Sequence, residues 1–366
     1  MEAPVLSAQT DTIDATADTL PGEFAWPRVL RRLLVLAAVL AGAVALVSLL
    51  PGLDSVRDAF AGARWEWLVV AALLEVLSCL SYVVVFRAVF CPRMPWRASY
   101  EIGAAELATN SVVSVGGAGG LALGAWILRR GGMPAALIAR RTVAFFLITS
   151  LASVTALIVA GIGLGTGVLH GAPDGALGWA PAALGLAAVL VALAIPPAAR
   201  FLARRIGHTS LEKALQALAA GVEEALALLR SRDLAVIAGA AGYMLFDVAM
   251  LGVCFAAFGL AVPPAGVLLM AYLIGQLGGL IPLPGGVGGV DGGLIGTLVL
   301  YGAGATAAAT AVLAYRAIVL LLPLALGVPA LRQVRRRLQG EAARVDRCDA
   351  GRARGGRVGG LAVETD

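Results

Sequence analysis

The chain has 366 residues, of which 60% are hydrophobic and only 14% are charged, and its mean hydropathy is +0.89. This composition excludes an ordinary soluble domain and is typical of a polytopic helical membrane protein. The net charge of +5 comes almost entirely from arginines that flank apolar runs. Such arginines indicate the cytoplasmic rim of a membrane protein and give no reason to expect a nucleic-acid partner.

The first part of the chain predicts two membrane spans and then a broken segment. Residues 1–28 are polar and acidic, so we expect a disordered cytoplasmic N-terminus. Spans follow at about 33–50 and 66–86. The segment 98–130 is interrupted by glycines at 114–120, and its second arm, 121–128, is far shorter than the roughly 20 residues that a span needs. We therefore predict that this segment is a re-entrant hairpin.

The rest of the chain predicts four further spans, an amphipathic helix and a second hairpin. The spans are expected at about 141–164, 179–201, 234–258 and 305–326. Leucines recur at helical spacing over 209–230, opposite charged residues, which predicts an interfacial connecting helix. Residues 331–366 form a basic cytoplasmic tail, and residues 29–330 form one transmembrane domain.

The strongest local signal is the stretch 278–293, which contains two prolines and eight glycines inside an apolar region. These residues break a continuous helix. A broken backbone at membrane depth requires protein or a water-filled cavity around its polar groups. We predict a hairpin with arms at about 265–281 and 294–301. The break is either a packing hinge alone or a hinge that also holds a ligand.

The distribution of positive charge favours hairpins that return to the face they entered. In that scheme the outside carries only Arg57 and Arg64, Arg316 lies within a span, and every other lysine or arginine faces the inside. Both termini are then cytoplasmic. The charge count does not separate hairpins from pairs of full crossings, so a count of eight or more transmembrane segments stays open.

The resulting scheme is an all-α membrane protein with about six full spans and two oppositely oriented hairpins. Its halves, about 29–164 and 179–330, form an inverted repeat, as in many transporters. Several residues recur at matching positions of the two halves. The pairs are Gly116 with Gly286, Gly119 with Gly289, Gly132 with Gly302, Glu106 with Gln276, Glu75 with Asp247, and Arg141 with Arg316.

Four charged residues lie at predicted membrane depth, where each costs about 2.5–3.5 kcal/mol. They are Glu75, Asp247, Asp291 and Arg316. One interpretation is structural pairing, for example between Asp291 and Arg316. In the other, Arg316 and Arg141 bind an anionic group together with backbone donors of the broken helices, and Glu75, Asp247 and Glu106 carry protons if transport is ion-coupled. The candidate substrate-binding residues are Arg316, Arg141, Asp291, Gly285, Gly286, Gly288, Glu75, Asp247, Glu106 and Gln276.

Several chemical functions find no support in the sequence. The G-x-G-x-x-A match at 117–122 has no βαβ unit around it, and no P-loop is present. The cysteines and histidines show no metal-ligand spacing, and no nucleophile triad or acid–base dyad stands out. We expect no enzymatic activity, cofactor or metal. The pairs Gly116/Gly120 and Gly292/Gly296 have the small-xxx-small spacing of helix packing.

The motif Pro282–Asp291, followed by Tyr301-Gly302 and Tyr315-Arg316, resembles the lysylphosphatidylglycerol synthase transmembrane-region family. These flippase-like proteins are similar to the flippase domain of the multiple peptide resistance factor. The resemblance extends over about residues 30–335, although the first hairpin lacks the prolines of the second. We expect no aminoacyl-transferase domain after the short tail, so the resemblance implies a translocator of a lipid or lipid-linked anionic headgroup and not a synthase.

Three functions therefore compete. The first is translocation of a lipid or lipid-linked anionic headgroup across the cytoplasmic membrane, with membrane lipids as partners. The second is secondary transport of a small soluble anion, which a closed, ion-sized cavity would favour. The third is a non-transporting accessory subunit of an envelope glycosyltransferase.

Overall fold

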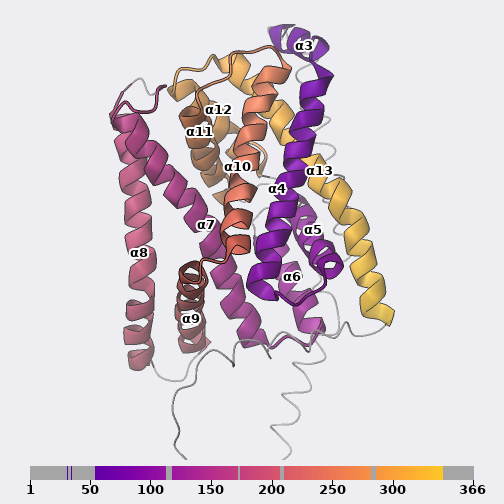
Figure 1. The fold of residues 1–366 in the computed structure, drawn as a ribbon, viewed down its shortest axis with the longest axis vertical. Helices are drawn as coiled ribbons and strands as arrows, with labels where there is room; N and C mark the ends of the chain where they lie inside the picture. Colours follow the sequence, from indigo (N-terminus) through magenta and orange to yellow (C-terminus); the bar gives the residue numbers. More distant parts are fainter. Residues whose placement is uncertain are drawn as a thin grey trace, which may run out of the picture.

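The computed structural model describes residues 31, 34, 54–112, 118–171, 174–206, 210–281 and 286–340. Within these residues the chain is helical and contains no β-strand, and its long helices form a bundle (Figure 1). The predicted N-terminal segment 1–28 and nearly all of the first predicted span, 33–50, lie outside the described residues.

Five of the helices are long and apolar enough to cross a membrane. They are α4 (Trp65–Phe90), α7 (Ala135–Gly165), α8 (Ala176–Ile206), α10 (Leu234–Ala257) and α13 (Ala305–Gly340). They lie where five of the six spans were predicted, although α7 begins earlier than expected and α13 continues past Pro323 and Pro329 into the basic tail. Large apolar side chains such as Leu184 and Leu190 face outwards, as lipid contact requires. The protein is therefore a multi-pass membrane protein.

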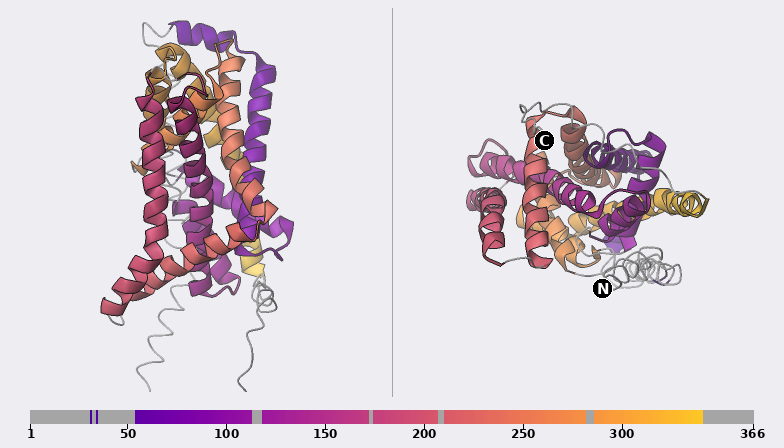
Figure 2. Two further views of the ribbon diagram at one scale, coloured as in Figure 1. Left: turned by 60° about the vertical axis from the view of Figure 1, so that its left-hand side comes forward. Right: turned by 90° about the horizontal axis from the view of Figure 1, so that it is seen from below.

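Two further helices accompany the long ones. The short helix α3 (Asp54–Ala61) precedes α4, and α9 (Ser210–Arg230) joins α8 to α10. The predicted amphipathic helix 209–230 is thus confirmed as a helix. It runs across the lower end of the bundle, transverse to the long helices, and packs against α7 and α8 (Figure 2).

The two predicted hairpin segments each form a pair of short helices. The first pair is α5 (Trp96–Val112) and α6 (Ala118–Arg130), and the second is α11 (Ala265–Leu277) and α12 (Gly289–Leu300). A 3-10 turn, η2 (Gly278–Leu280), follows α11. In each pair the two helices pack against each other, and the pairs lie at opposite ends of the bundle (Figure 1).

The helix α12 begins earlier than the sequence predicted. We expected a second arm from residue 294, but Gly289, Gly292 and Gly293 are already helical. The reason is steric. A Cβ atom on Gly293 would lie 3.0 Å from the Cα atom of Gly275, and a Cβ atom on Gly289 would collide with the backbone of Gly278. These glycines allow α11 and α12 to cross closely without ending the helix.

The prediction that Gly292 and Gly296 pack against another helix is wrong within the described part of the chain. Both glycines are exposed, and a Cβ atom on either would meet no other atom within 4 Å. The close crossing instead uses Gly289 and Gly293, which have the same spacing on the neighbouring face of α12. Gly120 of the first pair does pack closely, since its Cβ would lie 2.5 Å from the carbonyl oxygen of Glu106.

The centre of the bundle is the contact between α4 and α10, which is the most extensive helix pair. Around it, α13 packs on α5 and α7 packs on α11. One cluster of buried apolar side chains surrounds α4, α5 and α7, and a second surrounds α10, α11, α12 and α13. Polar groups in this interior therefore lie among apolar side chains and need partners there.

Candidate functional site

The break between α11 and α12 brings a glycine turn to the start of a helix. Gly286 has φ +65° and Gly288 has φ +88°. Only glycine adopts this left-handed region readily, which explains these two glycines directly. Residues 282–285, including the candidate residue Gly285, lie outside the described residues. The turn leads into α12, whose first backbone N–H groups form an electropositive helix end.

Asp291 links this helix end to Arg316 of α13. The backbone N–H of Gly288 donates to Asp291 Oδ2 at 2.7 Å. Arg316 Nε donates to Asp291 Oδ1 at 2.6 Å, and the Arg316 residue is only 8% exposed. One carboxylate thus caps α12 and fixes the arginine, and the predicted pairing of Asp291 with Arg316 is present. A Cβ atom on Gly286 would lie 3.6 Å from Arg316 Nη2, so the guanidinium lies beside the turn.

The break that carries this ion pair is flanked by exposed residues. The candidate residue Gln276 is exposed, and so are Gly288 and the apolar residues Leu277 and Ile281. Leu277 is 55% exposed and Ile281 is 51% exposed. The end of α11 and the turn after it therefore present exposed apolar side chains at the same break that carries the charged pair.

The structure brings Glu75 and Asp247 together at the α4–α10 crossing. Glu75 is 4% exposed and Asp247 is 6% exposed, and the charge of Asp247 acts on Glu75. Tyr272 of α11 donates a hydrogen bond to Asp247 Oδ2 at 3.0 Å. The sequence matched these two acids as equivalent positions, and their meeting in the interior agrees with that match.

Glu106 occupies a separate position between α4, α5 and α6. Tyr82 Oη of α4 donates to Glu106 Oε2 at 2.8 Å, and the glutamate is 1% exposed. A Cβ atom on Gly124 of α6 would collide with Glu106 Oε1, so that helix lies directly over the carboxyl group. Gln276, its sequence counterpart, is exposed, so the two positions differ in environment.

Replacing Tyr82 with phenylalanine is expected to lower the free energy of unfolding by about 1–3 kcal/mol, because Glu106 loses its donor while it stays buried. The matched control is Tyr100→Phe on α5, whose side chain is only half-buried and for which we expect little change. The measurement is the thermal unfolding midpoint in detergent. Equal midpoints for the two variants would contradict the prediction.

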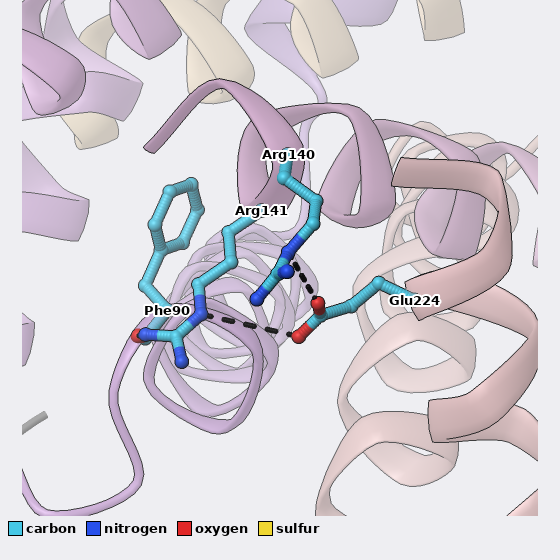
Figure 3. A network of polar contacts seen from close by, with 4 residues as sticks. All are labelled: Phe90, Arg140, Arg141 and Glu224. Carbon is cyan, nitrogen blue, oxygen red and sulfur yellow. Dashed lines mark hydrogen bonds and ion pairs between the residues drawn. The ribbon is translucent and has the colours of Figure 1, made fainter. Parts of the chain in front are cut away.

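Arg141 does not join Arg316. It lies near the start of α7, where its Nη1 donates to the carbonyl oxygen of Phe90 at the end of α4 (Figure 3). Its Nε lies 4.0 Å from Glu224 Oε1 of α9, and Arg140 Nε lies 2.7 Å from Glu224 Oε2. Arg141 therefore ties α4, α7 and α9 together at the lower end of the bundle, whereas Arg316 lies beside α12. A role of Arg141 in binding substrate remains a prediction.

Replacing Glu224 with glutamine is expected to lower the free energy of unfolding by about 1–3 kcal/mol, since two arginines lose a buried anionic partner. The neighbouring Glu223 provides a matched control. It pairs with Arg200, but both side chains are more than half exposed, so Glu223→Gln is expected to change stability by at most about 1 kcal/mol. Chemical denaturation of both variants tests the difference, and a larger loss at Glu223 would contradict it.

Residues 33–327 match the family described as the lysylphosphatidylglycerol synthase TM region. The match covers most of the chain and includes both short-helix pairs. The chain belongs to this family. The predicted resemblance is thereby confirmed, and no curated protein matches the sequence.

Several polar partners in this lysylphosphatidylglycerol synthase TM-region protein were not predicted from the sequence. Tyr82, Tyr272 and Glu224 each contact a candidate residue, but they lie on other helices, so no periodic pattern relates them to it. A weak signal was available for the tyrosines. Each hydroxyl lies in an apolar helix, where it needs a hydrogen-bond partner.

Proposed function

We propose that this protein moves the anionic headgroup of a lipid or lipid-linked molecule across the cytoplasmic membrane. It acts as a translocator and not as an enzyme, and both of its termini lie in the cytoplasm. The observation that carries the proposal is the Arg316–Asp291 pair at the broken start of α12. A guanidinium beside a helix N-terminus suits a phosphate group.

The surroundings of the pair favour a lipid over a small soluble anion. Leu277 and Ile281, exposed apolar residues at the break that carries the pair, can contact lipid tails that stay in the bilayer. A separate groove of about 560 Å³ between α7, α10 and α11, whose lining does not include the pair, has no charged side chain and suits an acyl chain better than a free anion. A soluble anion would instead favour a closed polar cavity.

In this proposal the two short-helix pairs are re-entrant hairpins that enter from opposite faces, and the halves form an inverted repeat. The helix contacts support this symmetry. In the repeat, α5, α6 and α7 of the first half correspond to α11, α12 and α13 of the second. Helix α5 contacts α13 and, equivalently, α11 contacts α7. Helix α6 contacts α7 and, equivalently, α12 contacts α13. Two-sided access to one central region is what such a repeat provides.

Reconstitution into liposomes tests the function directly. Labelled phosphatidylglycerol is incorporated, and its exposure to a membrane-impermeant quencher is followed with and without protein. We expect protein-dependent transbilayer movement. Its absence would overturn the proposal, and uptake of radiolabelled phosphate in its place would support transport of a small anion.

A further inference from the structure

The crossing of α4 and α10 holds two buried acids close to the middle of both helices. The helices approach closely because Gly239 of α10 lies against the backbone of α4, and a Cβ atom there would lie 2.9 Å from the backbone nitrogen of Val85. Glu75 and Asp247 are both more than nine-tenths buried. A charge on one therefore acts on the other across a poorly screened interior.

Both acids keep one carboxyl oxygen without a partner. Cys79 Sγ donates to Glu75 Oε1 at 3.6 Å, and Tyr272 Oη donates to Asp247 Oδ2 at 3.0 Å. The remaining oxygens, Glu75 Oε2 and Asp247 Oδ1, are buried and accept no hydrogen bond. The hydroxyl of Tyr315 is also buried without a hydrogen bond, and it lies within electrostatic reach of both acids. Buried polar atoms without partners are rare, so three of them facing one another's charges call for a specific explanation.

The groups that face the pair do not neutralise two negative charges. They come from four helices and are Cys79 of α4, Tyr243 of α10, Tyr272 of α11 and Tyr315 of α13, and the charge of Arg316, also on α13, acts on Tyr315. Ser78 also faces Asp247, while its hydroxyl donates to the carbonyl of Tyr243. The thiol and phenol groups are neutral near pH 7. Arg316 is held by Asp291 at 2.6 Å, so its charge is already engaged.

Two neighbouring buried carboxylates do not both ionise without a cation between them. A metal ion is a poor candidate for that cation. The described residues contain no group of three or more histidine, cysteine or acidic side chains able to hold one. A proton fits better, because it needs no added volume and removes one of the two like charges.

We propose that Glu75 and Asp247 hold one exchangeable proton between them and that this proton couples to substrate movement. The coupling rests on the proposed function, whereas the proton site does not. The reaction is protonation of one carboxylate by water-borne H⁺, with no bond to carbon formed or broken. Loss of the proton leaves two like charges at the contact between the halves, which pushes α4 and α10 apart.

Infrared difference spectroscopy tests the proton site without any transport assay. The wild-type protein in lipid nanodiscs is expected to show a protonated carboxyl band at neutral pH that disappears as the pH rises. Glu75→Gln and Asp247→Asn should each shift or remove this band, and the double variant should lack it. Glu106→Gln is the matched control, since it removes a different buried acid and should leave this band in place. Circular dichroism and size-exclusion chromatography establish which variants fold, and one folded single variant is sufficient.

The proposed proton site would be contradicted by a wild-type spectrum without a titrating carboxyl band, or by a band that neither single variant alters.

Coupling is tested separately in liposomes with a pH gradient. Movement of labelled phosphatidylglycerol should depend on the gradient in the wild type and lose that dependence in Glu75→Gln. A wild type that shows the band but moves no lipid would refute the proposed function and leave the proton site standing. If the wild type moves labelled phosphatidylglycerol at the same rate with and without the pH gradient, the proposed coupling is refuted.

Discussion

Replacing Arg316 with alanine is expected to abolish protein-dependent movement of labelled phosphatidylglycerol and to destabilise the fold. The substitution removes the guanidinium that donates to Asp291 at 2.6 Å. A hydrogen bond to a charged group contributes about 1.5–3 kcal/mol, and Asp291 would remain at the helix break without its cation. The liposome assay and the thermal unfolding midpoint measure the two effects separately.

Two further substitutions distinguish a specific role of the Arg316 side chain from the general effect of losing a positive charge. Arg316→Lys keeps the charge but loses the planar fork, so we expect partial recovery of stability and little recovery of lipid movement. Arg200→Ala removes an exposed arginine that pairs with Glu223 at 3.1 Å, and it should leave both measurements nearly unchanged. Lipid movement by Arg316→Ala at the wild-type rate would refute the role of this arginine.

Replacing Gly278 with alanine is expected to be among the most damaging single-methyl additions in the chain. A Cβ atom at this position would collide with the carbonyl oxygen of Gly289, at the crossing of α11 with α12. Because both partners are backbone, no change of rotamer relieves the contact, and overpacking of this kind costs about 1–3 kcal/mol or more. The two helices would have to separate, which displaces Asp291 from Arg316.

Gly296 provides the matched control in the same pair of helices. It is exposed, and an added Cβ would meet no other atom within 4 Å. Gly296→Ala should therefore leave the unfolding midpoint unchanged or raise it slightly, because alanine favours a helix over glycine by about 1 kcal/mol. Thermal unfolding of both variants decides the matter. A midpoint for Gly278→Ala equal to that of Gly296→Ala would show that the close crossing is not needed.

The two arginines that the sequence matched have different surroundings. Arg316 contacts a carboxylate at a helix start, whereas Arg141 contacts the carbonyl end of α4 and shares Glu224 with Arg140. The two matched acids, unlike the two matched arginines, lie close together, because Glu75 and Asp247 meet at the α4–α10 crossing. In the proposed function the second half therefore supplies the headgroup contact, and the contact between the halves supplies the proton site.

The positions of the long helices could be predicted because each consists of a continuous apolar run of sufficient length. The positions of the short-helix pairs could be predicted because glycine and proline interrupt such a run. The start of α12 could not be predicted from the glycines alone. A glycine that ends a helix and a glycine at a close helix crossing look alike in sequence, and only the position of Gly275 against Gly293 separates them.

The sequence by itself determined that this is a helical membrane protein of the lysylphosphatidylglycerol synthase TM-region family, with broken segments and rare charges at membrane depth. Those properties follow from hydrophobicity and backbone chemistry, which act locally along the chain. Only the tertiary structure decided which charges meet. It paired Asp291 with Arg316, Glu75 with Asp247, and Arg141 with Glu224. Contacts between distant helices depend on how the helices pack, and the spacing of residues within each helix does not contain that information.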